Sequence, residues 1–318
     1  MALRDVIGQD RAINILLRTI QIGKIPSAYL FAGESGIGKK FTAINLAKAL
    51  NCQNEGGDCC DECSSCRKIA AKVHPDILLI SPEEGQIRIE EIRAIDNTLS
   101  FKPFEGRKKV IIVDEADNMN PYAANAFLKT LEEPPEDSLI ILISSSPDRL
   151  PDTIKSRCSR VNFTPLPSEA CEKVIKTVIT HRSTLNTISL LVRLSMGRPG
   201  LAISGDLIEE RAWFMKLLGE MLQAEKNGWT SKEDMGKWLN LAFNLLRDMV
   251  IMKITNDETK LINIDLAEYI KKLSNSMNLK VIIENYQKLN TVRRYLNFNL
   301  NRSLTWNYIG SILRKREG

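Results

Sequence analysis

Residues Gly33–Lys40 read Gly-Glu-Ser-Gly-Ile-Gly-Lys-Lys. They follow the short apolar run Tyr29–Ala32 and open the helical pattern Lys39–Leu50. The spacing matches G-x-x-x-x-G-K, a loop whose backbone N–H groups surround phosphate while the lysine reaches the phosphate oxygens. A glycine turn at the start of a helix is the alternative. The strand–loop–helix context favours the phosphate-binding interpretation.

Apolar runs and helical patterns alternate over residues 1–165. The runs of strand length are Tyr29–Ala32, Ile77–Ile80, Val110–Val113 and Leu139–Ile143. The helical patterns are Lys39–Leu50, Ile89–Leu99 and Pro121–Leu131. Unbroken apolar runs are typical of parallel strands that are covered on both faces. The alternation predicts an α/β domain over residues 1–165, in which helices surround a parallel sheet.

Pro165 and Pro167 end this alternation, and helical periodicity dominates the rest of the chain. A chain of 318 residues exceeds the size of one compact core, since single cores stop growing at about 250–300 residues. We expect a small helical domain over residues 166–204, with one or two helices and a turn at Gly197–Gly200, and an all-helical domain over residues 205–318. In the latter, apolar residues recur with helical spacing at Trp238, Leu241, Ala242, Leu245, Leu246, Met249 and Val250. This stripe indicates a buried bundle face, which is favoured over a groove for a cofactor or partner.

Composition excludes several classes of protein. Apolar residues make up 43% and charged residues 26% of the chain, which excludes a disordered or collagen-like protein. No apolar run approaches the roughly 20 residues of a membrane span. Residues Met1–Asp5 lack the apolar stretch of a signal peptide, so we expect a cytoplasmic protein. A net charge of +5 is compatible with a partner that binds DNA but does not establish one.

The cysteines are clustered. Five of the seven are Cys52, Cys59, Cys60, Cys63 and Cys66. In a reducing compartment such a cluster indicates a metal site before disulfides. Four of them have the spacing of a closed tetrahedral zinc site, Cys52, Cys60, Cys63 and Cys66.

Two alternatives to zinc remain for this insert. An iron–sulfur cluster would require a cysteine in place of Ala70, followed by proline, and neither is present. Unligated thiols are the second alternative. Cys59 is the surplus thiol and competes with Cys60 for a ligand position, whereas His74, next to Pro75, has the setting of an ordinary strand entry.

Acidic and hydroxyl residues follow two of the predicted strands. Asp114 and Glu115 end the run Val110–Val113. In a P-loop protein the first acid supports Mg²⁺ and the second polarises the attacking water, and a solvated turn is the alternative. Ser144 and Ser145 end the next run, where a hydroxyl either faces a γ-phosphate or caps the strand end.

Together these motifs resemble the clamp-loader branch of the AAA+ ATPases, the bacterial DNA polymerase III clamp-loader family. The resemblance covers most of the first 200 residues. The matching segments are Ile7–Gln9, Pro26–Phe31, Gly33–Lys40, the cysteine insert 52–66, Asn125–Pro135 and Ser156–Cys158. The block Asn125–Pro135 and the Ser-Arg-Cys triplet are highly specific together. The resemblance implies an AAA+ P-loop domain, a small helical lid domain and a C-terminal helical collar, which the last 110 residues fit only by class and length.

Two departures from the family pattern imply a non-motor subunit. Motor subunits carry Ser or Thr after the P-loop lysine, and here Lys40 replaces that hydroxyl. Motor subunits also carry a sensor arginine three residues after a glycine; counted from Gly197 this position holds Gly200, while Arg198 lies two residues early. The remaining nucleotide-binding candidates are intact, Gly33, Gly36, Gly38, Lys39, Asp114 and Glu115. The resemblance therefore leaves binding of ATP or ADP without hydrolysis open.

The family resemblance also implies partners and a role. Such a subunit forms a hetero-pentameric ring with gamma/tau and delta subunits, as part of the DNA-directed DNA polymerase holoenzyme. The ring loads the sliding clamp onto primer-template DNA. Arg157, which alone would be taken for a surface arginine, is expected to serve as a finger for a neighbouring ATPase site. The alternatives are a gamma/tau-type motor subunit and a purely architectural subunit, in which Arg157 only holds the interface.

Overall fold

The computed structural model describes residues 2–54, 56–179, 185–223, 228–296, 298 and 300–314. The chain divides into two compact units. The N-terminal unit comprises Met1–Val178 and Gly197–Leu201, and the C-terminal unit comprises Ile179–Met196 and Ala202–Gly318. The small domain expected over residues 166–204 is thus shared between the two units, and the three-domain division stays a prediction.

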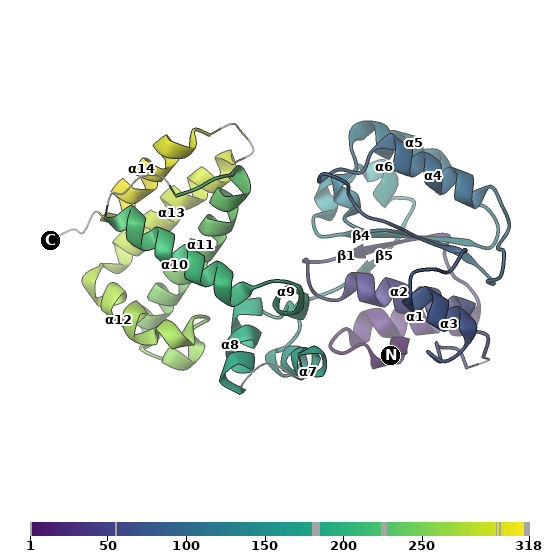
Figure 1. Cartoon of the computed structure of the whole chain (residues 1–318), viewed down its shortest axis with the longest axis horizontal. Coiled ribbons are helices and arrows are strands. Elements are labelled where there is room, and N and C mark those ends of the chain that lie inside the picture. Colours follow the sequence, from purple (N-terminus) through teal and green to yellow (C-terminus); the bar gives the residue numbers. More distant parts are fainter. Residues whose placement is uncertain are drawn as a thin grey trace. The chain divides into compact units, whose positions relative to one another are not determined.

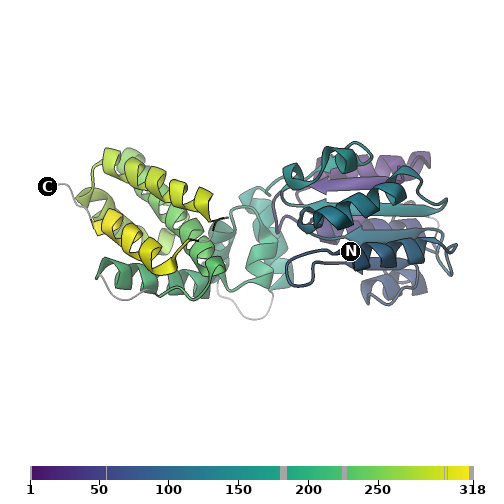
Figure 2. The same cartoon turned by 90° about the horizontal axis from the view of Figure 1, so that it is seen from above.

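The N-terminal unit is a parallel sheet between two layers of helices (Figures 1 and 2). Its strands are β1 (Ala28–Ala32), β2 (Ile77–Ile80), β3 (Lys109–Val113), β4 (Ser138–Ser144) and β5 (Ser159–Asn162), in the order β2-β3-β4-β1-β5. Its α-helices are α1 (Asp10–Ile22), α2 (Lys39–Asn51), α3 (Ser64–Ala70), α4 (Ile89–Leu99), α5 (Pro121–Glu132), α6 (Asp152–Lys155) and α7 (Ser168–Val178). Short 3-10 helices lie at Leu3–Asp5, Ala116–Asn118 and Pro147–Arg149. The predicted α/β class, the four predicted strands and the parallel sheet are confirmed.

Burial on both faces explains the unbroken apolar strands. Every residue of β1, β3 and β4 is buried. Figure 1 shows α1, α2 and α3 on one face of the sheet and α4, α5 and α6 on the other. Because successive strand residues point to opposite faces, Leu30, Ile111 and Ile140 pack toward α4 and α5. The sheet thereby places the carboxyl ends of its strands at one edge.

The edge strand β5 was not among the predicted strands. Only Val161 of its four residues is buried, and it pairs with Phe31 of β1. The strand continues into Phe163, whose N–H donates to the Ala32 carbonyl at 2.8 Å. Strand β5 reads Ser-Arg-Val-Asn and has no apolar run to recognise, in contrast to the other edge strand, β2, whose four residues are all apolar although only Ile80 is buried.

The C-terminal unit is helical throughout its described residues. Its helices are α8 (Leu185–Ser195), α10 (Leu207–Leu222), α11 (Lys232–Thr255), α12 (Ala267–Ser276), α13 (Leu279–Tyr295) and α14 (Arg302–Arg314), with 3-10 turns at Glu258–Lys260 and Ile264–Leu266. Helix α9 (Pro199–Ser204) begins in the N-terminal unit and ends in this one. The described residues between 168 and 204 therefore form three helices, so the expectation of one or two was wrong. Pro199 starts α9 at its first position rather than ending a turn.

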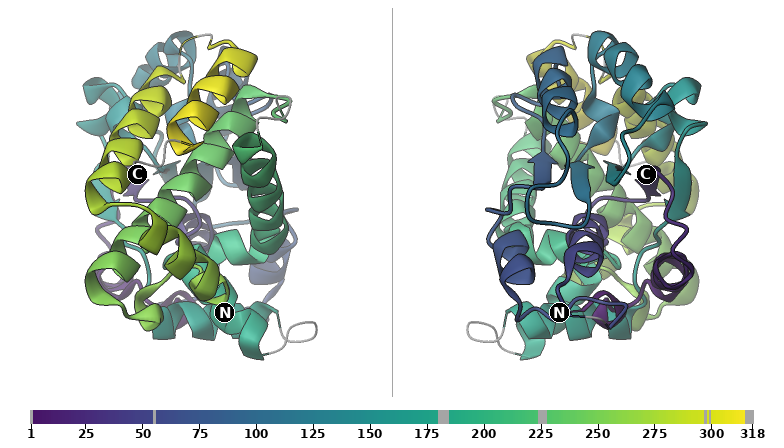
Figure 3. Two further views of the ribbon diagram at one scale, coloured as in Figure 1. Left: turned by 90° about the vertical axis from the view of Figure 1, so that its left-hand side faces the viewer. Right: turned by 90° about the vertical axis from the view of Figure 1, so that its right-hand side faces the viewer.

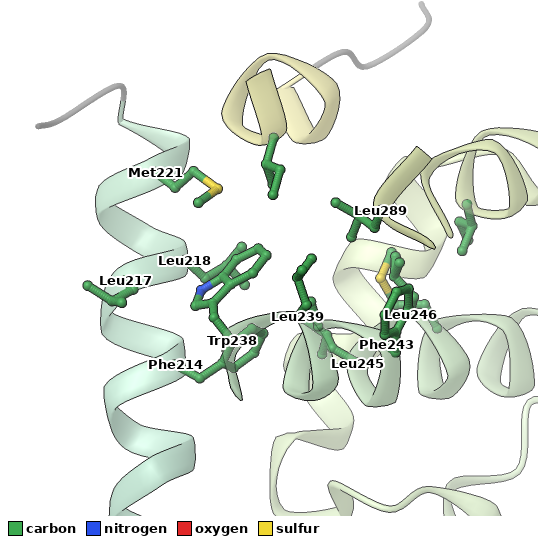
Figure 4. Packing of buried hydrophobic residues seen from close by; sticks show 14 of the residues in the cluster. Phe214, Leu217, Leu218, Met221, Trp238, Leu239, Phe243, Leu245, Leu246 and Leu289 are labelled. Atoms are coloured by element: carbon green, nitrogen blue, oxygen red, sulfur yellow. The ribbon is translucent and has the colours of Figure 1, made fainter. Parts of the chain in front are cut away.

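The predicted stripe on α11 is the buried face of this bundle. The left panel of Figure 3 shows the ribbons of the bundle helices. Trp238 is fully buried and points toward α10, where its ring lies 5.3 Å from that of Phe214 (Figure 4). Leu241 and Val250 are partly buried against the same cluster. Helix α11 begins at a capping box, in which the Ser231 hydroxyl accepts from the Asp234 N–H. The bundle interpretation is confirmed.

No helix in the described ranges is long and apolar enough to cross a membrane.

Candidate functional site

The loop Gly33–Lys40 joins the buried end of β1 to the start of α2. The Gly33 N–H donates to the Ser144 carbonyl at the end of β4 (3.2 Å), which fixes the loop at the carboxyl edge of the sheet. Gly38 caps α2 with φ +97°, a conformation that strains any residue with a side chain. The first amides of α2 therefore face the edge where α/β proteins bind phosphates.

Lys39 is folded into its own loop. Its side chain is buried, and Nζ donates to the carbonyls of Gly33 (2.6 Å) and Glu34 (2.5 Å). Burial lowers the pKa of Lys39 to about 8, although the carboxylates of Asp114, Asp117 and Glu34 oppose this shift. The ammonium thus lies among carbonyl oxygens, a position from which it can turn to phosphate oxygens.

Lys40 pairs with the acid that the sequence assigns to Mg²⁺. Its Nζ lies 2.9 Å from Asp114 Oδ2, at the end of β3, and 3.5 Å from the Ser81 hydroxyl, just after β2. The second Asp114 oxygen accepts from the Glu115 N–H at 3.1 Å. Both oxygens of this carboxylate therefore have partners within the chain.

The other polar residues at this edge make local contacts. Glu115 adopts φ +48°, and its carboxylate accepts from the Asn118 amide at 2.9 Å. The buried Ser144 hydroxyl accepts from the Ser146 N–H (3.1 Å), whereas the Ser145 N–H donates to Asp117 (3.2 Å). The Ser144 hydroxyl thus caps the end of its strand. The nucleotide-binding roles of these residues stay predictions.

The start of α9 packs directly on the phosphate-binding loop. The Gly200 N–H donates to the Gly36 carbonyl at 2.8 Å, and a Cβ at Gly200 would lie only 2.9 Å from Gly36 Cα. A Cβ at Gly36 would in turn lie 3.1 Å from Leu201. Arg198 reaches Glu34 at 3.4 Å. Only glycine fits at position 200, so the position of the family's sensor arginine provides a backbone contact instead of a charged side chain.

The structure brings four cysteines together in the insert after α2. The Sγ atoms of Cys52, Cys60, Cys63 and Cys66 all lie within 4.8 Å of one another. The Cys63 N–H donates to Cys60 Sγ at 3.3 Å, and the Cys66 N–H donates to Cys63 Sγ at 3.4 Å. Burial would raise the pKa of Cys63, but N–H donors from Gln53 and Cys66 lower it below the usual thiol value. The cluster could hold a metal ion.

Charged side chains, rather than an apolar core, tie the insert to its surroundings. The Asp58 carboxylate accepts from the N–H groups of Leu3 (2.8 Å) and Arg4 (3.0 Å). Lys48 of α2 pairs with Asp61 at 2.7 Å. The buried apolar cluster at this place is made of cysteines, with Ala2 and Ala49 packed against it. Little apolar area is therefore buried here without a metal.

Cys59 lies outside the four-cysteine group that the described residues form. Its side chain is buried, and burial together with the carboxylates of Asp58 and Asp61 raises its pKa to about 12. Burial also raises the pKa of Cys52 and Cys66, so it is the position of Cys59 outside the group, and not its pKa, that separates it from the four candidate ligands. His74 is also buried, and it contacts the Ser65 hydroxyl (3.2 Å) and the Asp76 N–H (3.2 Å).

Arg157 lies on the surface between the ends of two helices of the N-terminal unit. Its Nη1 donates to the Thr153 carbonyl of α6 at 2.8 Å, and Nη2 pairs with Glu132, the last residue of α5. Its side chain is 34% exposed. The neighbouring Cys158 points into the core, where burial raises its pKa to about 11. The inward cysteine and the two contacts fix the direction of the guanidinium.

Comparison with known proteins identifies the family. Residues 8–167 match the family model described as DNA polymerase III, delta subunit, and residues 219–309 match the model of its C-terminal part. The DNA polymerase III subunit delta' of Bacillus subtilis is 33% identical over 285 residues, 83% of this chain and 83% of that protein. This chain belongs to the delta-prime family of DNA polymerase III subunits.

Other relatives agree with this assignment. The delta' subunit of Pseudomonas aeruginosa is 34% identical over 295 residues, 87% of this chain and 88% of that protein. A gamma subunit-related protein of Thermotoga maritima has a similar fold, with a TM-score of 0.52 and 23% identity over 95% of this chain and 98% of that chain. The predictions of a clamp-loader-family chain and of an AAA+ type fold are confirmed.

Two residues that contribute to these sites, Glu132 and Asp58, were not predicted from the sequence. Glu132 lies in the quoted block Asn125–Pro135, yet its pairing with Arg157 depends on the meeting of α5 and α6 in space. Asp58 lies directly before Cys59 and Cys60, and its contact with the N-terminal backbone has no signature in the spacing. An acidic residue beside a predicted metal site is the only signal that pointed to Asp58.

Proposed function

We propose that this delta-prime chain is the non-motor subunit of a clamp-loader ring. It would assemble with gamma/tau and delta subunits into a hetero-pentamer that loads the sliding clamp onto primer-template DNA during replication in the cytoplasm. The observation that carries the proposal is the ion pair between Lys40 and Asp114 at 2.9 Å. Because the chain's own ammonium binds this carboxylate, Mg²⁺-dependent hydrolysis is disfavoured at this loop.

Arg157 would act on a neighbouring subunit as a catalytic finger. A planar guanidinium can bind two γ-phosphate oxygens at once. Thr153 and Glu132 hold Nη1 and Nη2 on the side of its own chain. The part of the side chain that solvent reaches is available to another subunit. Release or exchange of the Glu132 contact would accompany binding of the phosphate.

The phosphate-binding loop would hold a nucleoside phosphate without hydrolysing it. The nucleotide-binding set is Gly33, Gly36, Gly38, Lys39, Asp114 and Glu115. The supporting observation is that Gly38 and Lys39 present backbone and ammonium donors at the carboxyl edge of the sheet. ATP or ADP would supply the phosphates.

The cysteine cluster would hold one structural zinc ion. A Zn–S bond of about 2.3 Å places the sulfurs of a regular tetrahedron about 3.8 Å apart, and all four sulfurs here lie within 4.8 Å of one another. Four thiolates leave no open position, so the ion would have a structural role. It would replace the apolar core that this insert lacks.

Turnover of ATP separates the non-motor subunit from the motor alternative. We expect the isolated chain with Mg²⁺ and ATP to release no more phosphate than a Lys39→Ala variant. The same chain mixed with its gamma/tau and delta partners should form rings that hydrolyse ATP. Hydrolysis by the isolated chain at the rate of the motor subunit would contradict the proposal.

A further inference from the structure

The ammonium of Lys40 lies where the ends of three elements meet. Lys40 belongs to the first turn of α2, Asp114 follows β3 and Ser81 follows β2. The Nζ atom lies 2.9 Å from Asp114 Oδ2 and 3.5 Å from Ser81 Oγ. In a P-loop protein the residue after the lysine and the acid after the strand hold the metal ion between them. Here a side-chain cation joins the same two positions.

We propose that Lys40 is a built-in counter-cation that replaces Mg²⁺, so that this loop binds a nucleoside phosphate without a divalent metal. The inference rests on the proposed nucleotide binding at Gly33–Lys40 and adds the identity of the cation. Because the ammonium is covalently attached to the chain, the cation position is occupied whatever the Mg²⁺ concentration. The ammonium also carries one positive charge and no open coordination positions, so it cannot bridge the β- and γ-phosphate oxygens as the metal ion of a hydrolysing P-loop does.

The charges at the site agree with this substitution. A divalent ion on Asp114 would have to displace Lys40 or remain beside its positive charge. A bound diphosphate, in contrast, brings negative charge to two ammonium groups, those of Lys39 and Lys40. Lys39 already lies within the loop, and Lys40 keeps 40% of its side chain exposed beside it. The pair supplies two monovalent cations where a hydrolysing P-loop uses one lysine and one metal ion.

Binding of a fluorescent ADP analogue to the full chain tests the proposal. The dissociation constant is measured by anisotropy with excess Mg²⁺ and again with EDTA. The chain should bind in EDTA, and Mg²⁺ should not tighten binding. Lys40→Thr restores a hydroxyl and frees Asp114, so its binding should become magnesium-dependent, by about tenfold for one lost charge-assisted contact. The exposed Lys24→Thr serves as the matched control and should behave like the unchanged chain.

A second variant keeps the test decisive if Lys40→Thr does not fold. Lys40→Met keeps the length of the side chain but removes its ammonium and adds no metal ligand, so binding in EDTA should weaken by about tenfold. Unchanged binding in EDTA by this variant would overturn the role of Lys40. Thermal unfolding of each variant verifies its fold.

The remaining outcomes distinguish a failure of the counter-cation role of Lys40 from a failure of the proposed nucleotide site. Binding by the unchanged chain only with Mg²⁺ would overturn the counter-cation and leave nucleotide binding intact. Binding by Lys40→Thr that is equally independent of Mg²⁺ would also overturn it. No binding with or without Mg²⁺ would overturn both this inference and the proposed nucleotide site, while leaving the role of Arg157 to its own test.

Discussion

Replacement of Arg157 by alanine should affect a neighbouring subunit far more than its own fold. Within the chain the guanidinium contacts the Glu132 carboxylate and the Thr153 carbonyl. The two paired side chains are 34% and 49% exposed, and solvent-exposed ion pairs contribute only about 0.2–1 kcal/mol. We therefore expect the free energy of unfolding to fall by about 1 kcal/mol or less.

The expected effect on the neighbour is larger. Finger arginines contribute about 10³–10⁵ to the rate of phosphoryl transfer, which corresponds to about 4–7 kcal/mol of activation free energy. Arg157→Lys keeps the charge but loses the planar fork, so it should restore little of the rate. The expected loss of stability is much smaller than the expected rise in the neighbour's activation free energy. We therefore expect Arg157→Ala rings that are folded and assembled but inactive at this interface.

The assay compares clamp-loader rings rebuilt with the unchanged chain, with Arg157→Ala and with Arg149→Ala. Arg149 is an exposed arginine of the same unit and serves as the matched control. Size-exclusion chromatography verifies assembly, after which clamp-stimulated ATP hydrolysis and clamp loading are measured. Total hydrolysis should fall only in part, because the proposed ring would have several ATPase sites, whereas loading should fall more. Normal loading by correctly assembled Arg157→Ala rings would reduce Arg157 to an interface residue.

Three further predictions concern the N-terminal unit. Cys63→Ser should reduce bound zinc from one per chain to none by elemental analysis, whereas Cys59→Ser should retain it; full zinc content in the first variant would exclude the four-thiolate site. Affinity for ADP should fall as pH rises past about 8, because Lys39, with its pKa of about 8, then loses the positive charge that attracts the phosphate. A dissociation constant that stays the same between about pH 7 and 9.5 would place Lys39 outside the site. Asp76→Ala should lower the free energy of unfolding by about 3 kcal/mol, since it deprives the N–H groups of Phe104, Glu105 and Gly106 of their acceptor. Burial would raise the pKa of Asp76, but those three donors lower it. The stabilisation by Asp76 is therefore present above the usual aspartate range and is lost as pH falls through the lowered pKa. Denaturant unfolding of both chains at neutral and low pH measures this difference, and equal stability of the two chains at neutral pH would contradict it.

Strands were predicted from the sequence where they are unbroken apolar runs, which holds for the buried strands and also for the edge strand β2. The strands β1, β3 and β4 read as unbroken apolar runs because solvent reaches neither side. Strand β5 has one buried residue, Val161, and is defined by its pairing with β1 rather than by its own composition. The first two residues of α9, Pro199 and Gly200, were expected to belong to a turn that begins at Gly197. The tertiary contact between Gly200 and Gly36 instead explains why a glycine lies within a helix.

The sites show the same limit of the sequence. Motif spacing brought Cys52, Cys60, Cys63 and Cys66 into one group, because thiolate spacing encodes a local structure. The replacement of the P-loop hydroxyl by Lys40 could also be predicted from the sequence. The contact between Lys40 and Asp114 could not be predicted, because the two residues are far apart along the chain and meet only through the packing of α2 beside β2 and β3.

Two contacts at the phosphate-binding loop suggest why such a subunit is useful in a ring. A motor subunit changes conformation with the presence of metal and γ-phosphate, since those groups hold its mobile segments. Here Lys40 already neutralises Asp114, and the start of α9 already rests on Gly36. We therefore expect the unit to keep one conformation through the ATPase cycle of its neighbours. An arginine on a unit that does not change shape meets the neighbour's phosphate in one fixed geometry, and fixed geometry is what a finger contributes to the transition state. Loss of its own hydrolysis would then support the action of Arg157 rather than being a mere decay of function.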